Sequence, residues 1–332
     1  TKLVGVDSFG MCCAEAELGI GSDDEGIMDI KEPVTIGADI KSVWPVDDVV
    51  LEIDNKSLTN RPDLWGHYGI AREFSAIFDR PLKKLPVANL EEYSNLPEVE
   101  IDIETNNCFR YSSIVAENVN IHHSNRKMAI RLNYAGMRDI NLLADLTNYV
   151  MLDVGLPMHA FDHKIVDGIK VIESDGNVVM TTLEREEHTV PKNAIVIADR
   201  NREPVAIAGI KGGLKSGISD ETNSVLFEAA VFDSETIRKA SRAIGLITDA
   251  SQRYEKSLDP ELTPVALARI IYLLKEIDSG AKVVSKFSDC YKKKYDKISI
   301  KLDPKFISKI VGMEISKEFT IKTLRALEFG VK

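Results

Sequence analysis

Five short stretches of the chain combine groups that could do chemistry with residues that shape loops or strands: 147–149, 155–162, 208–213, 225–228 and 248–255. His159 lies in the second stretch, and an imidazole with a pKa near 6.5 can orient or deprotonate a water molecule. Gly212 and Gly213 close the third stretch; they let the backbone approach a ligand and offer unencumbered N–H donors. Together these residue types indicate a polar binding or hydrolytic site.

Each candidate also has a plainer structural explanation. Glu228 follows three apolar residues, so its carboxylate either faces solvent on a strand or is placed in an apolar setting for a purpose. His159 is either a base or a histidine that hydrogen-bonds a neighbouring backbone group. As a base with an unperturbed pKa, it would make a hydrolysis rate change between about pH 5.5 and 8. The double glycine is either a ligand cradle or an ordinary tight turn.

Several familiar site types are excluded by the motifs. The sequence has no G-x-S-x-G elbow, no G-x-x-x-x-G-K-[ST] loop and no H-E-x-x-H pair. His122 and His123 are adjacent, so they point apart on a helix or a strand, and no cysteine is near enough in sequence to complete a zinc site. We therefore expect no metal site. The cysteines are scattered without C-x-x-C spacing, which is typical of a reducing cytoplasm: Cys12, Cys13, Cys108 and Cys290.

Composition limits the class of protein further. The 332 residues carry a net charge of −10, with 44% hydrophobic and 28% charged residues. This balance is too apolar for a disordered chain and too charged for a membrane bundle, and no apolar run approaches the ~18 residues of a membrane span. An acidic chain does not grip nucleic acid by bulk charge. The length suggests two or three domains, and the start at Thr1 suggests an excised piece of a longer protein.

The elements that must position these residues are predicted from periodicity and from turn residues. We expect strands and tight turns over 4–29, a strand over 49–53, and a helix that Asp63 caps and Pro81 ends, with Ile70, Phe74, Ile77 and Phe78 as its apolar stripe. Residues 83–98 indicate a linker. A helix over 127–143 and short strands over 169–173, 178–182 and 194–198 indicate a β-rich domain with added helices.

The C-terminal part of the chain is predicted to be helical after one more strand. Asp259 and Pro260 should open a long helix with Gly280 just past its end. A strand over 298–302 should precede two short helices, one over 304–311 and one opened by Ser316 and running towards Leu327, joined by a turn that contains Gly312. This pattern is typical of helix-turn-helix modules.

A family resemblance emerges from several motifs in a fixed order. They are Asn60-Arg61-Pro62-Asp63 with Gly69-Ile70-Ala71-Arg72-Glu73, Thr147-Asn148-Tyr149-Val150, Pro157-Met158-His159-Ala160-Phe161-Asp162, Gly212-Gly213, and Thr248-Asp249-Ala250-Ser251-Gln252-Arg253-Tyr254-Glu255. In this order they resemble the β subunit of bacterial phenylalanyl-tRNA synthetase. The resemblance covers essentially the whole chain.

The resemblance implies a multidomain α+β fold with a β-rich central editing domain of the B3/B4 type. It implies the C-terminal part of an OB-type tRNA-binding module over 1–42, a small helical B1-like domain over 43–92, the editing domain over 93–290, and the truncated start of a winged-helix-like, B5-like domain over 295–332. Small winged-helix-like domains would thus flank the editing domain. The family's aminoacylation site belongs to the α subunit, so this chain should not charge tRNA.

The implied activity is hydrolysis of tyrosine mischarged onto phenylalanine tRNA. His159 and Glu228 match the catalytic positions, with Glu228 as the acceptor of the tyrosine hydroxyl, and a further group of residues would bind substrate: Thr147, Asn148, Pro157, Gly212, Gly213, Thr248 and Ala250. Thr147 and Asn148 would hold the α-amino group or a water, or else have a turn or cap role. Arg253 and Glu255 are expected to form a structural ion pair.

The implied cofactors and partners belong to the complete synthetase. It would use ATP and Mg²⁺, whereas this piece needs neither, and it would pair with the α subunit in a heterotetramer, bind phenylalanine tRNA and act in the cytoplasm away from membranes. Two alternatives remain: a scaffold and tRNA-docking module in which editing is lost, and an unrelated β-rich binding protein, in which Glu228 and His159 should lie far apart.

Overall fold

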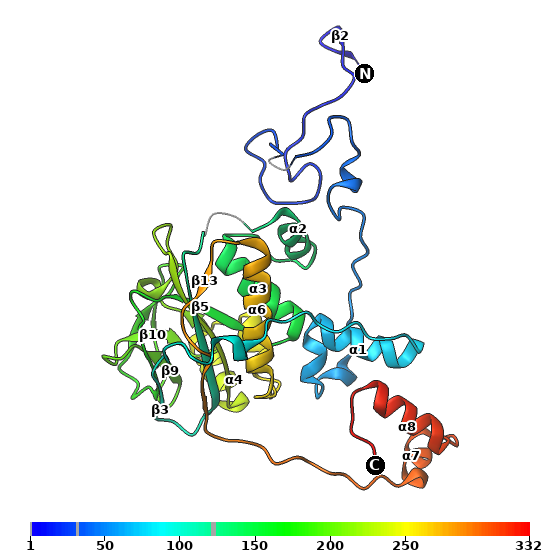
Figure 1. The fold of residues 1–332 in the computed structure, drawn as a ribbon, viewed down its shortest axis with the longest axis vertical. Coiled ribbons are helices and arrows are strands. Elements are labelled where there is room, and N and C mark those ends of the chain that lie inside the picture. Colours follow the sequence, from blue (N-terminus) through cyan, green and yellow to red (C-terminus); the bar gives the residue numbers. More distant parts are fainter. Residues whose placement is uncertain (1, 31–32, 121–123) are drawn as a thin grey trace.

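The computed structural model describes residues 2–30, 33–120 and 124–332. A central α/β domain holds most of the buried core, with an extended N-terminal segment on one side and a pair of C-terminal helices beside α1 (Figure 1). Among the described residues, every helix is too short or too polar to cross a bilayer. His122 and His123 lie outside the described residues.

The main sheet of the central domain is antiparallel, in the order β13-β4-β12-β5, with β14 also paired to β4. Its central strand β12 (Ser224–Phe232) is buried along its whole length, as its continuous apolar sequence requires. Its other strands are β4 (Cys108–Glu117), β5 (Met158–Asp162), β13 (Lys282–Val283) and β14 (Ser288–Tyr291). Because β4 and β5 flank β12 on both sides, every residue of β12 has a fixed facing direction.

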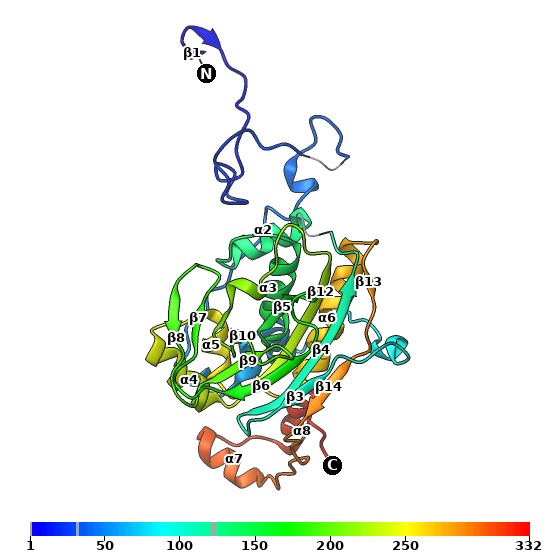
Figure 2. The ribbon, with the colours of Figure 1, turned by 90° about the vertical axis from the view of Figure 1, so that its left-hand side faces the viewer.

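A second sheet packs in the same domain, in the order β11-β10-β9-β6-β3 (Figure 2). Only its β3–β6 pair is parallel among the pairs of the described sheets. The strands are β3 (Ile101–Ile103), β6 (Ile169–Glu173), β9 (Ile195–Ala198), β10 (Pro204–Ile207) and β11 (Lys211–Gly212). Two small hairpins complete the strands: β1 (Lys2–Leu3) with β2 (Val6–Asp7), and β7 (Val179–Thr181) with β8 (Glu187–Thr189). The three strands expected between 169 and 198 are confirmed as β6, β7 and β9.

Two long helices pack on each other and on the main sheet: α3 (Leu142–Val154) against β5, and α6 (Leu262–Ile277) against β12 and β4. Three shorter helices complete the domain: α2 (Arg126–Tyr134), α4 (Ser234–Ile244) and α5 (Asp249–Tyr254). The prediction of one continuous helix over 127–143 is wrong, because the structure has two helices there. The stretch divides because Gly136 takes a left-handed conformation, and the Asn141 side chain then caps α3.

The long C-terminal helix of the domain begins and ends differently from the prediction. Glu261 precedes α6 without a side-chain cap, whereas Asp259 accepts a hydrogen bond from the Glu261 N–H (2.9 Å). Asp278, not Gly280, ends it. The segment 83–98 is also more than a linker: it contains the turn Leu90–Tyr93, and its Ala88 N–H donates to the Ala268 carbonyl (2.9 Å), so the segment lies along α6.

The motif Asn60-Arg61-Pro62-Asp63, just ahead of α1, has a structural role. Asp63 does not cap α1 (His67–Phe78), which begins after Gly66. Instead Asp63 lies in a 3₁₀ turn, where Arg61 and Arg72 both donate to its carboxylate (2.9 and 3.0 Å). Arg61 also donates to Glu73 (2.9 Å), so one ionic network ties the turn to the helix. This network lowers the pKa of Asp63 against the cost of its burial.

The apolar stripe expected on α1 is largely exposed, with Ile77 at 62% and Phe78 at 63%. The run 49–53, predicted as a strand, is extended and exposed but pairs with no described strand. Residues 298–302 likewise form no strand.

The two C-terminal helices are confirmed as α7 (Pro304–Val311) and α8 (Lys317–Ala326), joined through Gly312 in a left-handed conformation. Ser316 caps α8 as predicted. The helix α8 lies beside α1, where Lys322 pairs with Asp79 (2.7 Å) and Glu328 with Arg72 (3.0 Å).

Candidate functional site

Glu228 and His159 lie directly opposite each other on the neighbouring strands β12 and β5, and Ser113 of β4 lies opposite Glu228 on the other side. Residues that oppose each other in an antiparallel pair project from the same face. The adjacent Ser112 donates to Thr263 of α6 (2.9 Å), so Ser112 faces the helices. Glu228, His159 and Ser113 therefore project from the face of the main sheet that α6 does not cover.

Glu228 is enclosed by the fold. The residue is 4% exposed, and its Oε2 atom has no hydrogen-bond partner among the described residues. Burial raises the pKa of Glu228 to about 8 because an ionised carboxylate loses its hydration, and the nearby Tyr111 hydroxyl partly opposes this rise. The contact between the two falls short of a well-formed hydrogen bond, since the Tyr111 hydroxyl also lacks a partner. The site thus contains an unsatisfied acidic group, which is a costly arrangement for stability alone.

His159 is neutral in this setting. Burial and the charge of Lys211 lower its pKa to about 4. Although the residue as a whole is half-buried, its Nε2 atom is shielded from solvent and has no partner among the described residues. The ring packs edge-on against Phe161, with centroids 4.4 Å apart. A neutral imidazole with a free nitrogen can hold a water or a substrate group but is a weak base.

The double glycine brings the end of the second sheet to His159. A Cβ atom at Gly212 would lie 2.5 Å from His159 Cε1, so only a residue without a side chain fits against the ring. Gly213 differs from the expectation that both glycines offer unencumbered N–H groups, because its N–H donates to the Val205 carbonyl (2.8 Å). Lys211 is held by an ion pair with Glu184.

The helix α5 joins the two sheets at this site. Thr248 caps it, and the Thr248 hydroxyl donates to the Ile210 carbonyl (3.1 Å) just before β11. The Tyr254 hydroxyl contacts the carbonyl oxygens of Pro157 (3.2 Å) and Ala230 (3.0 Å), which lie two residues from His159 and from Glu228 along their strands and connections. Ala250, between these two anchors, is half-buried and packs against the core. The structure thus links positions 248–254 to the strands that carry the acid and the imidazole.

Two further expectations meet a different outcome in the structure. Thr147 and Asn148 lie within α3 rather than in a loop, and the Thr147 hydroxyl donates to the Ala144 carbonyl of the same helix (2.8 Å). The helix packs along β5, the strand of His159. The predicted Arg253–Glu255 pair is wrong, because Arg253 pairs with Asp249 one helical turn earlier (3.2 Å) and Glu255 pairs with Lys256 (2.8 Å).

Tyr111 and Tyr254 are the site neighbours that sequence reasoning missed as functional residues. Tyr254 stands in a quoted motif without a role, and Tyr111 stands in a strand with no motif at all. Both reach the site through strand register and through packing between layers, and neither property leaves a local sequence signal.

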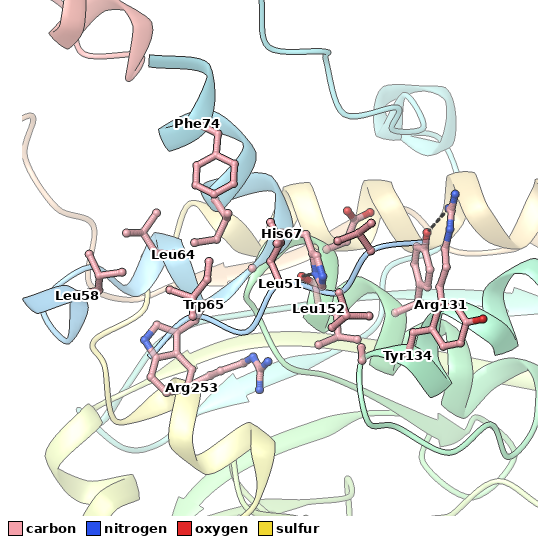
Figure 3. Close-up of a pocket in the computed structure, with 18 of the residues that line it drawn as sticks. Leu51, Leu58, Leu64, Trp65, His67, Phe74, Arg131, Tyr134, Leu152 and Arg253 are labelled. Carbon is pink, nitrogen blue, oxygen red and sulfur yellow. Dashed lines mark hydrogen bonds between the residues drawn. The ribbon is translucent and has the colours of Figure 1, made fainter. Parts of the chain in front are cut away.

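A cavity of about 740 Å³ lies elsewhere (Figure 3). It opens between the segment 48–74 and the helices α2, α3 and α5, and none of the predicted site residues lines it. Trp65 and Arg253 lie near each other in its wall, with the guanidinium carbon 5.9 Å from the ring centroid. Its volume suits a small ligand, but the buried carboxylate with a shifted pKa and the imidazole with a free nitrogen mark the other site.

The described residues contain no group of three or more His, Cys, Asp or Glu side chains arranged to hold a metal ion.

Comparison with known proteins gives the class of the chain. The B3/4 domain model matches residues 107–279, just over half of the chain and most of the central domain. The chain belongs to the B3/4-domain family.

The curated proteins that are similar to this chain share one name. The chain is 39% identical over 334 residues to the phenylalanine–tRNA ligase β subunit of Clostridium acetobutylicum, covering 98% of this chain and 42% of that protein. It is also 39% identical over 330 residues to the same subunit of Solibacter usitatus, with the same coverage. The resemblance found in the motifs is confirmed, and the chain spans less than half the length of these curated relatives.

A solved N-terminal fragment of the phenylalanyl-tRNA synthetase β subunit from Pyrococcus horikoshii is more distant. It is 16% identical with a TM-score of 0.37, covering 85% of this chain and 80% of that chain, and a likeness at that level carries no argument.

Proposed function

We propose that the central domain of this chain hydrolyses tyrosine that has been attached to phenylalanine tRNA by mistake. The observation that carries the proposal is the juxtaposition of two enclosed groups with free atoms, Glu228 Oε2 and His159 Nε2, directly across one strand pair. The alternative of an unrelated β-rich protein, with these residues far apart, is wrong. The domain limits 1–42, 43–92, 93–290 and 295–332 remain part of this proposal.

Discrimination is easier at such a site than in a synthetic pocket. Phenylalanine and tyrosine differ by one hydroxyl, and an apolar pocket rejects an added hydroxyl by only ~10²-fold. A site built to bind that hydroxyl rejects the analogue without it by ~10⁴ to 10⁵, because its buried acceptor is then left unpaired. Glu228 is buried and its Oε2 atom has no hydrogen-bond partner among the described residues, as such an acceptor requires.

The hydrolysis needs a positioned water. The water oxygen adds to the ester carbonyl carbon, the bond to the ribose oxygen breaks, and a water proton ends on that oxygen, which gives free tyrosine and uncharged tRNA. A neutral His159 accepts a hydrogen bond from this water at Nε2 and orients it, and its pKa of about 4 favours orientation over strong base catalysis. Gly212 packs against the ring and helps to fix its position.

The remaining substrate contacts follow the resemblance. Thr147 and Asn148 would hold the α-amino group or a water, and Pro157, Gly213, Thr248 and Ala250 would line the pocket. In the complete enzyme the chain would join an α subunit and bind phenylalanine tRNA in the cytoplasm, and the α subunit would use ATP and Mg²⁺ for aminoacylation.

The test compares deacylation of Tyr-tRNA and Phe-tRNA by the full-length chain in its native assembly. Above a pH of about 8, where Glu228 is ionised, Glu228→Ala should lower the preference for Tyr-tRNA by about 10- to 150-fold, the worth of a hydrogen bond to a charged group. Glu187→Ala is the matched control, because Glu187 is an exposed strand glutamate on β8. Equal preference in Glu228→Ala and wild type would refute the assignment. Absence of Tyr-tRNA deacylation in the wild type would instead favour the scaffold and tRNA-docking role.

A further inference from the structure

Tyr111 is placed beside Glu228 by strand register. On β4, Tyr111 lies opposite Ala230 of β12, and Ser113 lies opposite Glu228. Tyr111 and Glu228 are therefore diagonal neighbours on the same face of the main sheet. Diagonal neighbours are within reach of an aromatic side chain.

The Tyr111 hydroxyl forms no well-formed hydrogen bond with the described residues. The residue is fully buried, and its hydroxyl lacks a hydrogen-bond partner among the described residues. Buried hydroxyls are almost always paired, so an unpaired one beside an unpaired carboxylate oxygen needs an explanation. Tyr254 provides the contrast, since its hydroxyl contacts two carbonyl oxygens and has a clear structural role.

We propose, on the basis of the editing function above, that Tyr111 is a positioning residue that directs its hydroxyl to one oxygen of Glu228 and leaves Oε2 for the hydroxyl of the substrate tyrosine. Once Glu228 is ionised, its carboxylate accepts several hydrogen bonds, so one phenol from the protein and one from the substrate can share it. Tyr111 touches neither the ester nor the water and acts through Glu228.

The arrangement predicts a dependence on pH. The titratable groups around Glu228 are Cys108 and Tyr111 of β4, His159 of β5 and Tyr254 of α5. Burial raises the pKa of Cys108, Tyr111 and Tyr254 well above their ordinary values, and the pKa of His159 is lowered to about 4. These four stay neutral from about pH 6 to 8, so Glu228, with a pKa of about 8, is the member of the group that titrates near neutrality.

Tyr111→Phe is the test, in the full-length chain in its native assembly. Loss of the hydroxyl should lower the preference for Tyr-tRNA over Phe-tRNA by about 2- to 12-fold, the worth of one net hydrogen bond. It should also move the pH midpoint of that preference upwards, because a donor that favours the ionised carboxylate is gone. Deacylation of Phe-tRNA should not change.

Tyr93→Phe is the matched control, because Tyr93 is also buried and its hydroxyl also lacks a partner, but it lies on the turn Leu90–Tyr93 away from the strand pair. It should leave both the preference and the midpoint unchanged. The double variant Tyr111→Phe with Glu228→Ala should lose no more preference than Glu228→Ala alone.

Two results would overturn the inference while the editing function stands. In one, Glu228→Ala loses the preference but Tyr111→Phe keeps both the wild-type preference and the wild-type midpoint. In the other, Tyr111→Phe slows Tyr-tRNA and Phe-tRNA deacylation equally, which marks a purely structural role. If Glu228→Ala keeps the wild-type preference for Tyr-tRNA, the proposed function itself is refuted, and the inference about Tyr111 falls with it.

Discussion

Glu228 and His159 face each other across β12 and β5, and burial favours the uncharged form of both side chains. It raises the pKa of the carboxyl to about 8 and helps to lower that of the imidazole to about 4. At pH 7 the pair is therefore mainly a neutral acid beside a neutral base, and the two do not form an ion pair.

Replacing Glu228 by glutamine should change how stability depends on pH. Between its ordinary pKa of 4.5 and its folded pKa of about 8, wild-type Glu228 binds more protons in the folded state than in the unfolded state, so the free energy of unfolding falls as pH rises. The loss should reach up to about 5 kcal/mol by pH 8. Glu228→Gln lacks this loss and should gain stability relative to wild type as pH rises, as urea unfolding at pH 5 and at pH 8.5 would measure. A difference that does not vary with pH contradicts the buried state of Glu228.

His159 should titrate far below neutrality. Its folded pKa of about 4 lies below the ordinary 6.5, so its contribution to stability is complete above about pH 6.5 and is lost as pH falls towards 4. The imidazole NMR signal, assigned with His159→Gln, should stay constant from about pH 5.5 to 8 and move near pH 4. A titration midpoint near pH 6.5 for this signal would contradict the lowered pKa of His159. A deacylation rate that is constant from about pH 5.5 to 8 therefore does not show whether His159 acts as a base or only positions the water. The rate must also be measured below about pH 5, where His159 titrates.

Gly212→Ala should damage the site with little effect on the fold elsewhere. The new Cβ would lie 2.5 Å from His159 Cε1, so the ring or β11 must move, and overpacking of this kind costs about 1–3 kcal/mol. Thermal unfolding and Tyr-tRNA deacylation would measure the two effects. Gly26→Ala is the control, since a Cβ there meets no atom within 4 Å and its φ is not left-handed. Full deacylation activity in Gly212→Ala would show that the ring position is unimportant.

Asp63→Ala should loosen α1 without touching the central domain. The carboxylate holds Arg61 and Arg72, and its loss should cost about 1–3 kcal/mol, reduced by partial exposure. Hydrogen exchange should increase over His67–Phe78 and stay unchanged over β12. Asp167→Ala, at an exposed aspartate whose contact with Arg200 is 3.8 Å, should have no such effect. Unchanged exchange in α1 would mean that the network is dispensable.

Local signals predicted much of the secondary structure. Pro304, Gly312 and Ser316 mark the ends of α7 and α8 correctly, because caps and left-handed turns depend on a few neighbouring residues. Asp63 was misassigned because a side chain that can cap a helix can equally bind two arginines brought in by tertiary structure. The exposed run 49–53 alternates like a strand but has no described partner strand, and pairing cannot be predicted from one segment alone.

The candidate site was identified through motifs, whereas its geometry depends on pairing between distant segments. His159 and Glu228 come from strands whose register is set by the whole sheet, so their direct opposition has no local signal. The occupied N–H of Gly213 and the nearby phenol of Tyr111 are equally non-local.

Residues 225–229 of β12 are paired with β4 on one side and with β5 on the other, and this has a consequence for how the chain can change. One residue inserted ahead of Glu228 within the strand would turn that carboxylate into the layer against α6, where Ser112 and Thr263 now meet, and would bring an apolar side chain into its place. Length variation in this protein should therefore be confined to the connecting loops, and a functional relative with an odd-numbered insertion inside the strand should carry a bulge that restores the phase.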